Sequence, residues 1–413
     1  MRLSAGNVRW ELELASNGRF LAHSLAHSSD LPPLSASQIG LEEVLPELLE
    51  ELLGCSHRSC EVYSGHAGVS LVLYLLSRHD SVRFNRNTCA LHFDKLRPNE
   101  FSSHAYTFMC GRGGYYALRA VLFPSDHSAE ELQRIGRAEV LPSPREDCEL
   151  LYGRAGFLYC LFFVRRALNS PEMFSDLVIE LVRQIVNAGQ WTKVHLMWSW
   201  HGKRYLGAAH GVAGIVYVLL CCSPKELAHL RGIHILPLLE STVDNVLANH
   251  SIMTSGSRNV KSLTGSKSDM LVHFCHGATG WVPALLKLWL IPGKDKYLDS
   301  AVECGETVWE GGLLATKGPG ICHGIGGSIC AMIDLFTATQ HSLWLERSKY
   351  FSLALVRLLP ELTPHADSPR PLMEGRAGAL YALGLVSLIL SGKYASQSPP
   401  TEDWQTCFPG LGL

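Results

Sequence analysis

Residues 320–327 are GICHGIGG, a cysteine and a histidine directly followed by the pattern Gly-x-x-Gly, and the chain continues as the apolar run SICAMIDLF. Gly-x-x-Gly followed by an apolar run occurs seven times in the sequence. The glycine pairs are Gly65 and Gly68, Gly111 and Gly114, Gly153 and Gly156, Gly211 and Gly214, Gly277 and Gly280, Gly324 and Gly327, and Gly375 and Gly378. Successive patterns are roughly 40 to 65 residues apart, which is room for two helices and their loops.

Two kinds of helix are predicted between these glycines. The runs that follow the patterns, such as FLYCLFFVRRAL at 157–168, are apolar nearly all round, as in helices enclosed by others. Amphipathic stretches such as LEEVLPELLEELL at 41–53 alternate with them. Such pairs can stack as an open solenoid or close into a ring. Because the inner helices are too apolar for an exposed concave face, we expect an all-α fold, a seven-fold α/α toroid whose turns surround one axis.

Composition limits the class of protein. We expect one domain over residues 1–413, with a variable N-terminal segment at 1–40 and a mobile Ser/Lys/Gly loop at 251–269. A formal net charge of -2 gives no reason to expect nucleic acid as a partner. The apolar stretches are too short for a transmembrane segment, and the N-terminus lacks the apolar core of a secretory signal. Thirteen irregularly spaced cysteines indicate reduced thiols, so a cytoplasmic location is predicted.

The residues just before the glycines carry the candidate chemistry. The position before each first glycine holds Ser64, Cys110, Tyr152, His210, His276, His323 and Glu374 in turn, and the position before that is cysteine only at Cys275 and Cys322. A single Cys-His-Gly motif is more often explained by a buried cysteine beside a helix start than by a pair of metal ligands. Two such motifs at equivalent positions of the repeat favour a metal site. Thiolate and imidazole suit zinc, and three protein ligands leave one coordination position open. We therefore predict Cys275, Cys322 and His323 as ligands, and symmetry alone does not exclude His276.

Other polar residues near these turns have two interpretations each. His210 is either a general acid or base or a hydrogen-bonded core histidine. Glu149 and Glu374 could orient or complement it, and Lys317 is either a binding group for an anionic substrate or a solvated loop lysine. The predicted catalytic residues are His210, Lys317 and Glu149. The predicted cofactor-binding residues are Lys317, His276 and Glu374.

Four segments, YGRAG at 152–156, GAAHGVAG at 207–214, LVHFCHGATG at 271–280 and KGPGICHGIGG at 317–327, resemble motifs of the LanC-like proteins, eukaryotic relatives of bacterial lanthionine cyclases. The resemblance runs from about Ser64 to Glu374, and CFPGLGL at 407–413 resembles the C-terminus of the family. It implies a seven-fold α/α barrel with zinc held by Cys275, Cys322 and His323 and a catalytic His210. It also implies glutathione as cosubstrate, added to dehydroalanine or dehydrobutyrine residues of proteins or peptides.

This activity has a physical basis and several alternatives. Zinc lowers the pKa of a bound thiol, and the enolate formed by conjugate addition needs a proton, which His210 could give. The main alternative is a non-catalytic, regulatory protein that binds glutathione or a signalling partner. Lanthionine cyclisation would need a partner dehydratase and a precursor peptide, and the eukaryotic form of the motifs argues against it. A glycosidase would use paired carboxylates, which leaves both Cys-His-Gly sequences unexplained.

One position departs from the family pattern. Pro364 stands where the family has an arginine associated with a phosphate leaving group, and His365 and Arg370 are the nearest cationic residues. The resemblance therefore supports thiol addition more than phosphate elimination.

Overall fold

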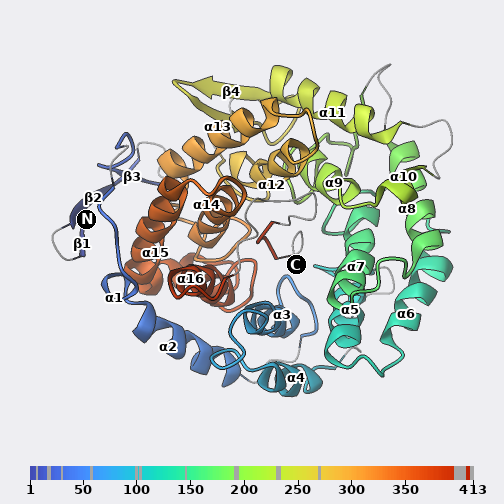
Figure 1. Cartoon of the computed structure of the whole chain (residues 1–413), viewed down its shortest axis with the longest axis horizontal. Helices are drawn as coiled ribbons and strands as arrows, with labels where there is room; N and C mark the ends of the chain where they lie inside the picture. The colour runs from blue at the N-terminus through green and yellow to red at the C-terminus, as the bar shows by residue number, and fades with distance from the viewer. Residues whose placement is uncertain are drawn as a thin grey trace.

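The computed structural model describes residues 1–5, 8–15, 20–28, 31–55, 59–97, 101, 105–144, 147–189, 195–228, 234–267, 271–394 and 406–409. Within these residues seven inner helices form a ring (Figure 1). They are α3 (His66–Ser77), α5 (Arg112–Leu122), α7 (Arg154–Ala167), α9 (Val212–Leu219), α12 (Ala278–Trp289), α14 (Ile325–Thr339) and α16 (Arg376–Leu390). Each packs against the next along the chain, and α16 packs against α3. The ring therefore closes, and the predicted α/α toroid is confirmed.

An outer layer covers the inner helices one for one. The outer helices are α4 (Arg86–Asp94) on α3, α6 (Ser128–Ile135) on α5, α8 (Ser175–Ala188) on α7, α11 (Ile235–Asn249) on α9, α13 (Lys296–Gly311) on α12, α15 (Ser342–Leu362) on α14 and α2 (Leu41–Leu53) on α16. Shorter segments are α1 (Ala36–Ile39), the π-helical η2 (Gly136–Val140), α10 (Pro224–Ala228) and the 3₁₀-helical η3 (Thr363–His365). Every residue of α3 is buried, whereas α8 buries one face, which fits the predicted difference between inner and outer helices.

The Gly-x-x-Gly patterns form the turns into the inner helices. The first glycine is the N-cap residue in each case, and the second lies under the carbonyl group of the residue six positions before it. A Cβ at Gly156 would overlap the carbonyl oxygen of Leu150, and one at Gly327 would overlap that of Ile321. Side chains at these positions would force the turn away from its helix, so the repeated glycines are a backbone requirement.

Neighbouring turns are joined by main-chain hydrogen bonds. Leu150 donates to the carbonyl oxygen of Ala209 over 3.1 Å, Cys275 to that of Cys322 over 3.2 Å, and Cys322 to that of Met373 over 2.7 Å. These bonds satisfy buried backbone groups and fix one turn against the next. As predicted, the turns lie around one axis.

Two small sheets lie outside the ring. The strands β1 (Arg2–Ala5), β2 (Val8–Leu14) and β3 (Leu21–His23) are antiparallel, with Leu3 opposite Trp10 and Leu12 opposite His23. The buried Trp10 packs edge-on against His23 and Tyr350, so the segment predicted as variable is held against α15.

A hairpin of β4 (Ser251–Thr254) and β5 (Ser257–Val260) lies within the segment predicted as a mobile loop, and residues 268 and 269 of that segment lie outside the described residues. The Asn259 amide oxygen of β5 accepts from the main chain of Ala278 at 2.8 Å, and its amide nitrogen donates to Leu271 at 3.0 Å. The hairpin thereby supports the turn that begins α12.

Residues 406–409 enter the middle of the ring (Figure 1). The main chain of Cys407 donates to the Asp334 carboxylate of α14 at 2.7 Å, and the hydroxyl of Tyr381 donates to the carbonyl oxygen of Cys407 at 2.6 Å. Phe408 stacks on Phe274 with ring centroids 4.7 Å apart. The segment therefore fills the axis and contacts the residue just before Cys275.

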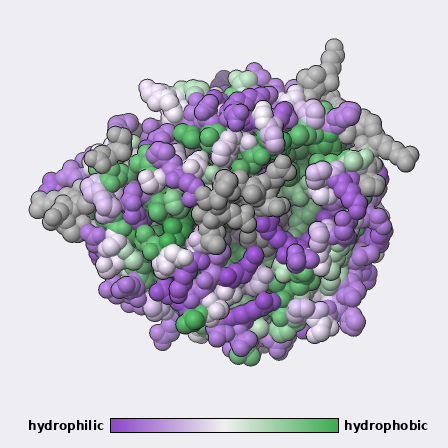
Figure 2. All heavy atoms as spheres, in the orientation of Figure 1, coloured by the Kyte–Doolittle hydropathy of each residue, from purple (hydrophilic) through white to green (hydrophobic). Residues whose placement is uncertain are grey.

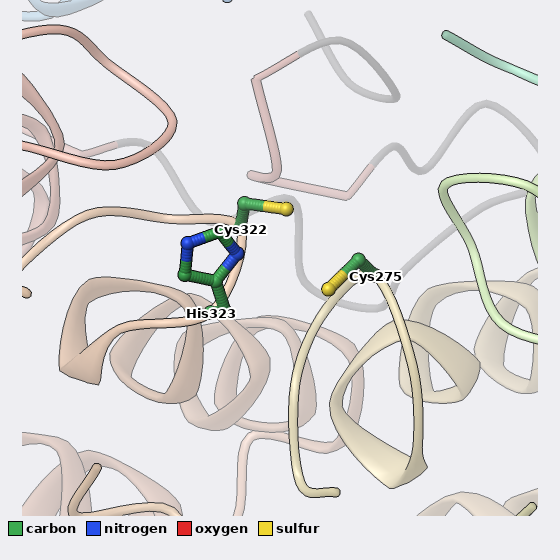
Figure 3. A group of neighbouring side chains, drawn as sticks. All are labelled: Cys275, Cys322 and His323. Carbon is green, nitrogen blue, oxygen red and sulfur yellow. The ribbon is translucent and has the colours of Figure 1, made fainter. Parts of the chain in front are cut away.

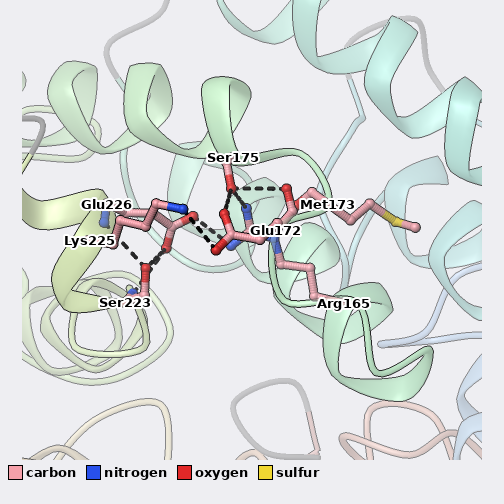
Figure 4. A network of polar contacts seen from close by, with 7 residues as sticks. All are labelled: Arg165, Glu172, Met173, Ser175, Ser223, Lys225 and Glu226. Carbon is pink, nitrogen blue, oxygen red and sulfur yellow. Dashed lines mark hydrogen bonds and ion pairs between the residues drawn. The ribbon is translucent and has the colours of Figure 1, made fainter.

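A buried ion pair fixes the inner layer to the outer one (Figure 4). Arg165 of α7 pairs with Glu226 of α10 at 2.7 Å, and both side chains are almost fully buried. Glu226 also accepts from the main chain and hydroxyl of Ser223, and Arg165 donates to Ser175 at the start of α8. Because each charge has several partners, the pair avoids the cost of an uncompensated buried ion.

The surface is polar around the periphery, with apolar side chains between the polar ones nearer to the middle (Figure 2). In the described part of the chain no helix is long and apolar enough to cross a membrane. All thirteen cysteines lie in the described residues, and no disulfide joins any two of them.

Candidate metal centre

The turns before α12 and α14 bring together the three predicted ligands, Cys275, Cys322 and His323 (Figure 3). The thiol sulfurs and an imidazole nitrogen lie within 4.8 Å of one another. Both cysteines are buried, and the His323 side chain is 14% exposed. Gly277 after the first cysteine has φ of 109°, a left-handed conformation that favours glycine, so the local sequence sets the direction of this turn.

Hydrogen bonds polarise the two thiols. The Cys275 thiol donates to the sulfur of Cys322, which holds the pKa of Cys322 well below its usual range and raises the pKa of Cys275. His323 and the hydroxyl of Tyr63 also donate to Cys322 and lower its pKa. The pKa of His323 is raised, because burial would lower it but the hydrogen bond and negative charge of Cys322 outweigh burial. Of the two thiols, that of Cys322 therefore ionises more readily.

These residues fit a zinc ion. Two sulfurs and one imidazole are a ligand set that zinc prefers, and three ligands leave a fourth position open. One nitrogen of the His323 ring faces the two sulfurs (Figure 3), and all three atoms lie within 4.8 Å of one another, so a single cation could contact all of them. Buried thiols are costly to ionise, and a cation bound between them would remove that cost.

A second group of charges borders the candidate metal centre. His323, Asp367 and Glu374 have ligand atoms within 4.8 Å of one another, and Nε2 of His323 lies 3.8 Å from the exposed Asp367 carboxylate. Burial raises the pKa of Glu374, and the nearby Asp367 and Cys322 raise it further against the opposing effect of His323. Lys317 is exposed and close enough for its charge to lower the pKa of His323. These charges could bind the charged ends of a small peptide.

The structure brings two further predicted residues together, His210 and Glu149. Nδ1 of His210 lies 2.7 Å from Oε2 of Glu149. Glu149 is 1% exposed and accepts hydrogen bonds from the main chains of Leu151 and Tyr152. These bonds fix the buried carboxylate beside the imidazole. The other imidazole nitrogen, Nε2, is then the atom of His210 that can exchange a proton with a substrate.

His276 connects these two groups. Its ring centroid lies 6.2 Å from that of His210 and 5.7 Å from that of Tyr205, and the residue follows Cys275 in the chain. The predicted proton donor therefore stands beside the turn that carries one of the predicted ligands.

Sequence reasoning missed Tyr63, Asp367 and Trp200, whose indole stacks on the imidazole of His210 with ring centroids 4.1 Å apart. Tyr63 could have been found, because it occupies the same place before the first glycine pair as Cys275 and Cys322 occupy before theirs. Trp200 and Asp367 lie outside the repeated patterns and carry no such signal.

The cationic residues nearest to Pro364 are on the same segment as Asp367. His365 and Arg370 are both exposed. Arg370 lines a cavity of about 240 Å³ together with Ser64 and His66, at the start of α3.

Comparison with known proteins places this chain in a family. The sequence model described as lanthionine synthetase C-like protein matches residues 56–395. Glutathione S-transferase LANCL1 of Danio rerio is 30% identical over 359 residues, covering 83% of this chain and 86% of that protein. LanC-like protein GCL1 of Arabidopsis thaliana is 31% identical over 327 residues, covering 73% and 71% respectively. Nisin cyclase, a solved structure, shares the fold with a TM-score of 0.62 at 16% identity, over 84% of this chain and 93% of its own. The chain belongs to the lanthionine synthetase C-like family.

Proposed function

We propose that this protein is a zinc-dependent glutathione transferase that adds the thiol of glutathione to dehydroalanine or dehydrobutyrine residues of proteins or peptides. The observation that carries the proposal is the set of Cys275, Cys322 and His323 on two adjacent turns, with the His210–Glu149 pair beside them. The name of the Danio rerio relative supports glutathione as the cosubstrate. We further propose a cytoplasmic location, where thiols stay reduced and glutathione is abundant.

The chemistry divides among the residues as follows. Zinc held by Cys275, Cys322 and His323 would lower the pKa of a thiol in its open position, so that glutathione reacts as a thiolate at neutral pH. The new carbon–sulfur bond forms at the β-carbon of the dehydroamino acid as its double-bond electron pair moves toward the carbonyl group. Nε2 of His210 then donates a proton to the α-carbon, while Glu149 keeps the Nδ1 proton in place. No oxidant or reductant is consumed.

Other charged residues would hold the two substrates. Lys317 is a candidate to bind a carboxylate of glutathione, and Glu374 is a candidate to bind its ammonium group. Opposite charges at the rim of a site orient a small ligand. His276, between His210 and the metal turn, would line the same space.

Adduct mass measured over time tests the proposal, with metal content and glutathione binding measured on the same samples. Purified protein is mixed with glutathione and a dehydroalanine peptide, for wild type, Cys322→Ala and His210→Ala. Cys304→Ala is the control, because Cys304 is a buried cysteine of α13 outside the site. We expect one zinc per wild-type chain, loss of zinc and adduct in Cys322→Ala, and adduct formation about 100-fold slower in zinc-loaded His210→Ala.

Two results would contradict the proposal. A wild type that binds zinc and glutathione but forms no adduct above the uncatalysed rate would favour the non-catalytic, regulatory alternative with a signalling partner. If the wild type contains no zinc, both the transferase proposal and the non-catalytic alternative lose the metal site on which they depend.

A further inference from the structure

The imidazole of His210 is covered on one face by an indole. The rings of Trp200 and His210 are 4.1 Å apart between centroids and 3° from parallel. Tyr152 lies parallel to both, within 7°, at about 6 Å. The His210 side chain keeps 17% exposure under this cover. The proton donor of the proposed reaction is thus held on an edge by Glu149 and on a face by Trp200.

A tight turn presents the indole. Trp200 and Lys203 exchange main-chain hydrogen bonds of 2.8 and 3.0 Å. The two residues between them, His201 and Gly202, have φ of 47° and 72°. Positive φ at both central positions defines a type I′ turn, which joins two antiparallel segments without splaying them.

The segments on both sides of the turn are anchored to the ring. Before it, the indole nitrogen of Trp198 donates to the carbonyl oxygen of Ile185 in α8 at 2.8 Å, and the main chain of Leu196 donates to Thr242 of α11 at 2.9 Å. After it, the main chain of Leu206 donates to Ser262 at 2.9 Å. The position of the indole is therefore set by the scaffold and does not depend on a substrate.

We propose that Trp200, held by the turn at residues 200–203, is a positioning residue that fixes the imidazole of His210 for proton donation. The inference rests on the proposed function of His210. Glu149 alone fixes one ring nitrogen but leaves the ring able to tilt about that hydrogen bond. The stacked indole prevents the tilt, excludes water from one face and attracts the imidazolium through its π electrons. Nε2 is thereby kept pointing in one direction, and substrate must approach from the side that the indole leaves open.

The first test replaces the indole. Trp200→Ala should lower kcat for adduct formation about 10-fold, the order expected when a reacting group loses its orientation, with KM for glutathione and zinc content unchanged. Trp200→Phe keeps a flat ring and should restore most of the loss. Nuclear magnetic resonance supplies a readout that needs no turnover. The ring protons of His210, assigned by their absence in His210→Ala, should be shifted by the indole ring current in wild type and lose that shift in Trp200→Ala.

The second test leaves both rings in place and disturbs only the turn. Gly202→Ala adds a methyl group with no atom within 4 Å, so its effect comes only from the strained positive φ. Gly256→Ala is the matched control, because Gly256 has φ of 88°, also has open space around it, and lies in the β4–β5 hairpin. We expect kcat to fall in Gly202→Ala and to stay at the wild-type value in Gly256→Ala.

The outcomes separate this inference from the proposed function. If the ring-current shift is absent from wild type, or if Trp200→Ala loses the shift and keeps full kcat, Trp200 does not position His210. If wild type forms no adduct but shows the shift and loses it in Trp200→Ala, the stack is real, while the proposed reaction and the role of Trp200 in it are both wrong.

Discussion

At the scale of single residues, the pairing of Glu149 with His210 makes the sharpest prediction. Glu149→Gln can offer an amide N–H where Nδ1 of His210 needs an acceptor, so the imidazole loses the partner that orients it. We expect adduct formation to slow about 10- to 100-fold with zinc content unchanged, because proton donation is affected and the ligands are not. Glu172→Gln, at an exposed glutamate far from the turns, serves as control. Equal rates for Glu149→Gln and wild type would mean that Glu149 is only a structural partner of the turn at residues 149–152.

The residues that the sequence could and could not identify differ in a physical way. Cys275, Cys322 and His323 were predictable because a repeat puts equivalent positions at one end of a ring, so a pattern in the sequence becomes proximity in space. The pairing of His210 with Glu149 needed the structure, because the two residues are 61 positions apart and sit at different places in their repeats. Trp200 was not predictable, since its position depends on a turn whose partner segments are distant in the chain.

At the scale of elements, the C-terminal segment 406–409 predicts a dependence of stability on pH. Burial raises the pKa of Asp334 from 3.8 to about 7, although hydrogen bonds from Thr406 and Cys407 oppose the rise. Because the pKa is raised in the folded state, the contribution of Asp334 to the free energy of unfolding is fully present below pH 3.8. This contribution is lost as the pH rises through 7. The loss is on the order of 4 kcal/mol for a shift of this size.

Asp334→Asn should therefore gain stability relative to wild type as pH rises from 4 to 7, because an amide can bond Thr406 and Cys407 without ionising. Denaturant unfolding of both proteins across this range measures the difference in free energy. A difference that does not change with pH would show that Asp334 has an ordinary carboxyl pKa in the folded protein.

The elements themselves were partly predictable. The seven inner helices followed from glycines whose missing side chains let each turn pass close to its helix, as at Gly156. The β4–β5 hairpin could not be predicted, because residues Ser257–Val260 lack an alternation of apolar and polar side chains. The hairpin is ordered by contacts with α13 and the start of α12. Similarly, the strands β1 to β3 are ordered by packing of Trp10 against distant side chains, which local sequence does not encode.

At the scale of the whole molecule, the two ends of the helical array meet and close the ring. The outer helix α2, near the start of the chain, covers the inner helix α16, near its end, and Glu51 pairs with Arg376 across this seam at 3.1 Å. In an open solenoid each repeat contacts only its neighbours, so terminal repeats can unfold alone. A closed ring has no terminal repeat, so we propose that the chain unfolds as one domain.

Leu48→Ala tests this at the seam. Leu48 of α2 is fully buried, and shortening it should lower the free energy of unfolding by about 2 to 5 kcal/mol. Because the ring is closed, hydrogen exchange should speed up equally in α3 and α16 at the seam and in α9 and α12 farther along the ring. Leu91→Ala, which shortens an exposed leucine of α4, should change neither the free energy of unfolding nor the rates of hydrogen exchange. Faster exchange confined to α2 and α16 would mean that the seam opens by itself, and the turns that carry Cys275 and Cys322 would then keep their stability without a closed ring.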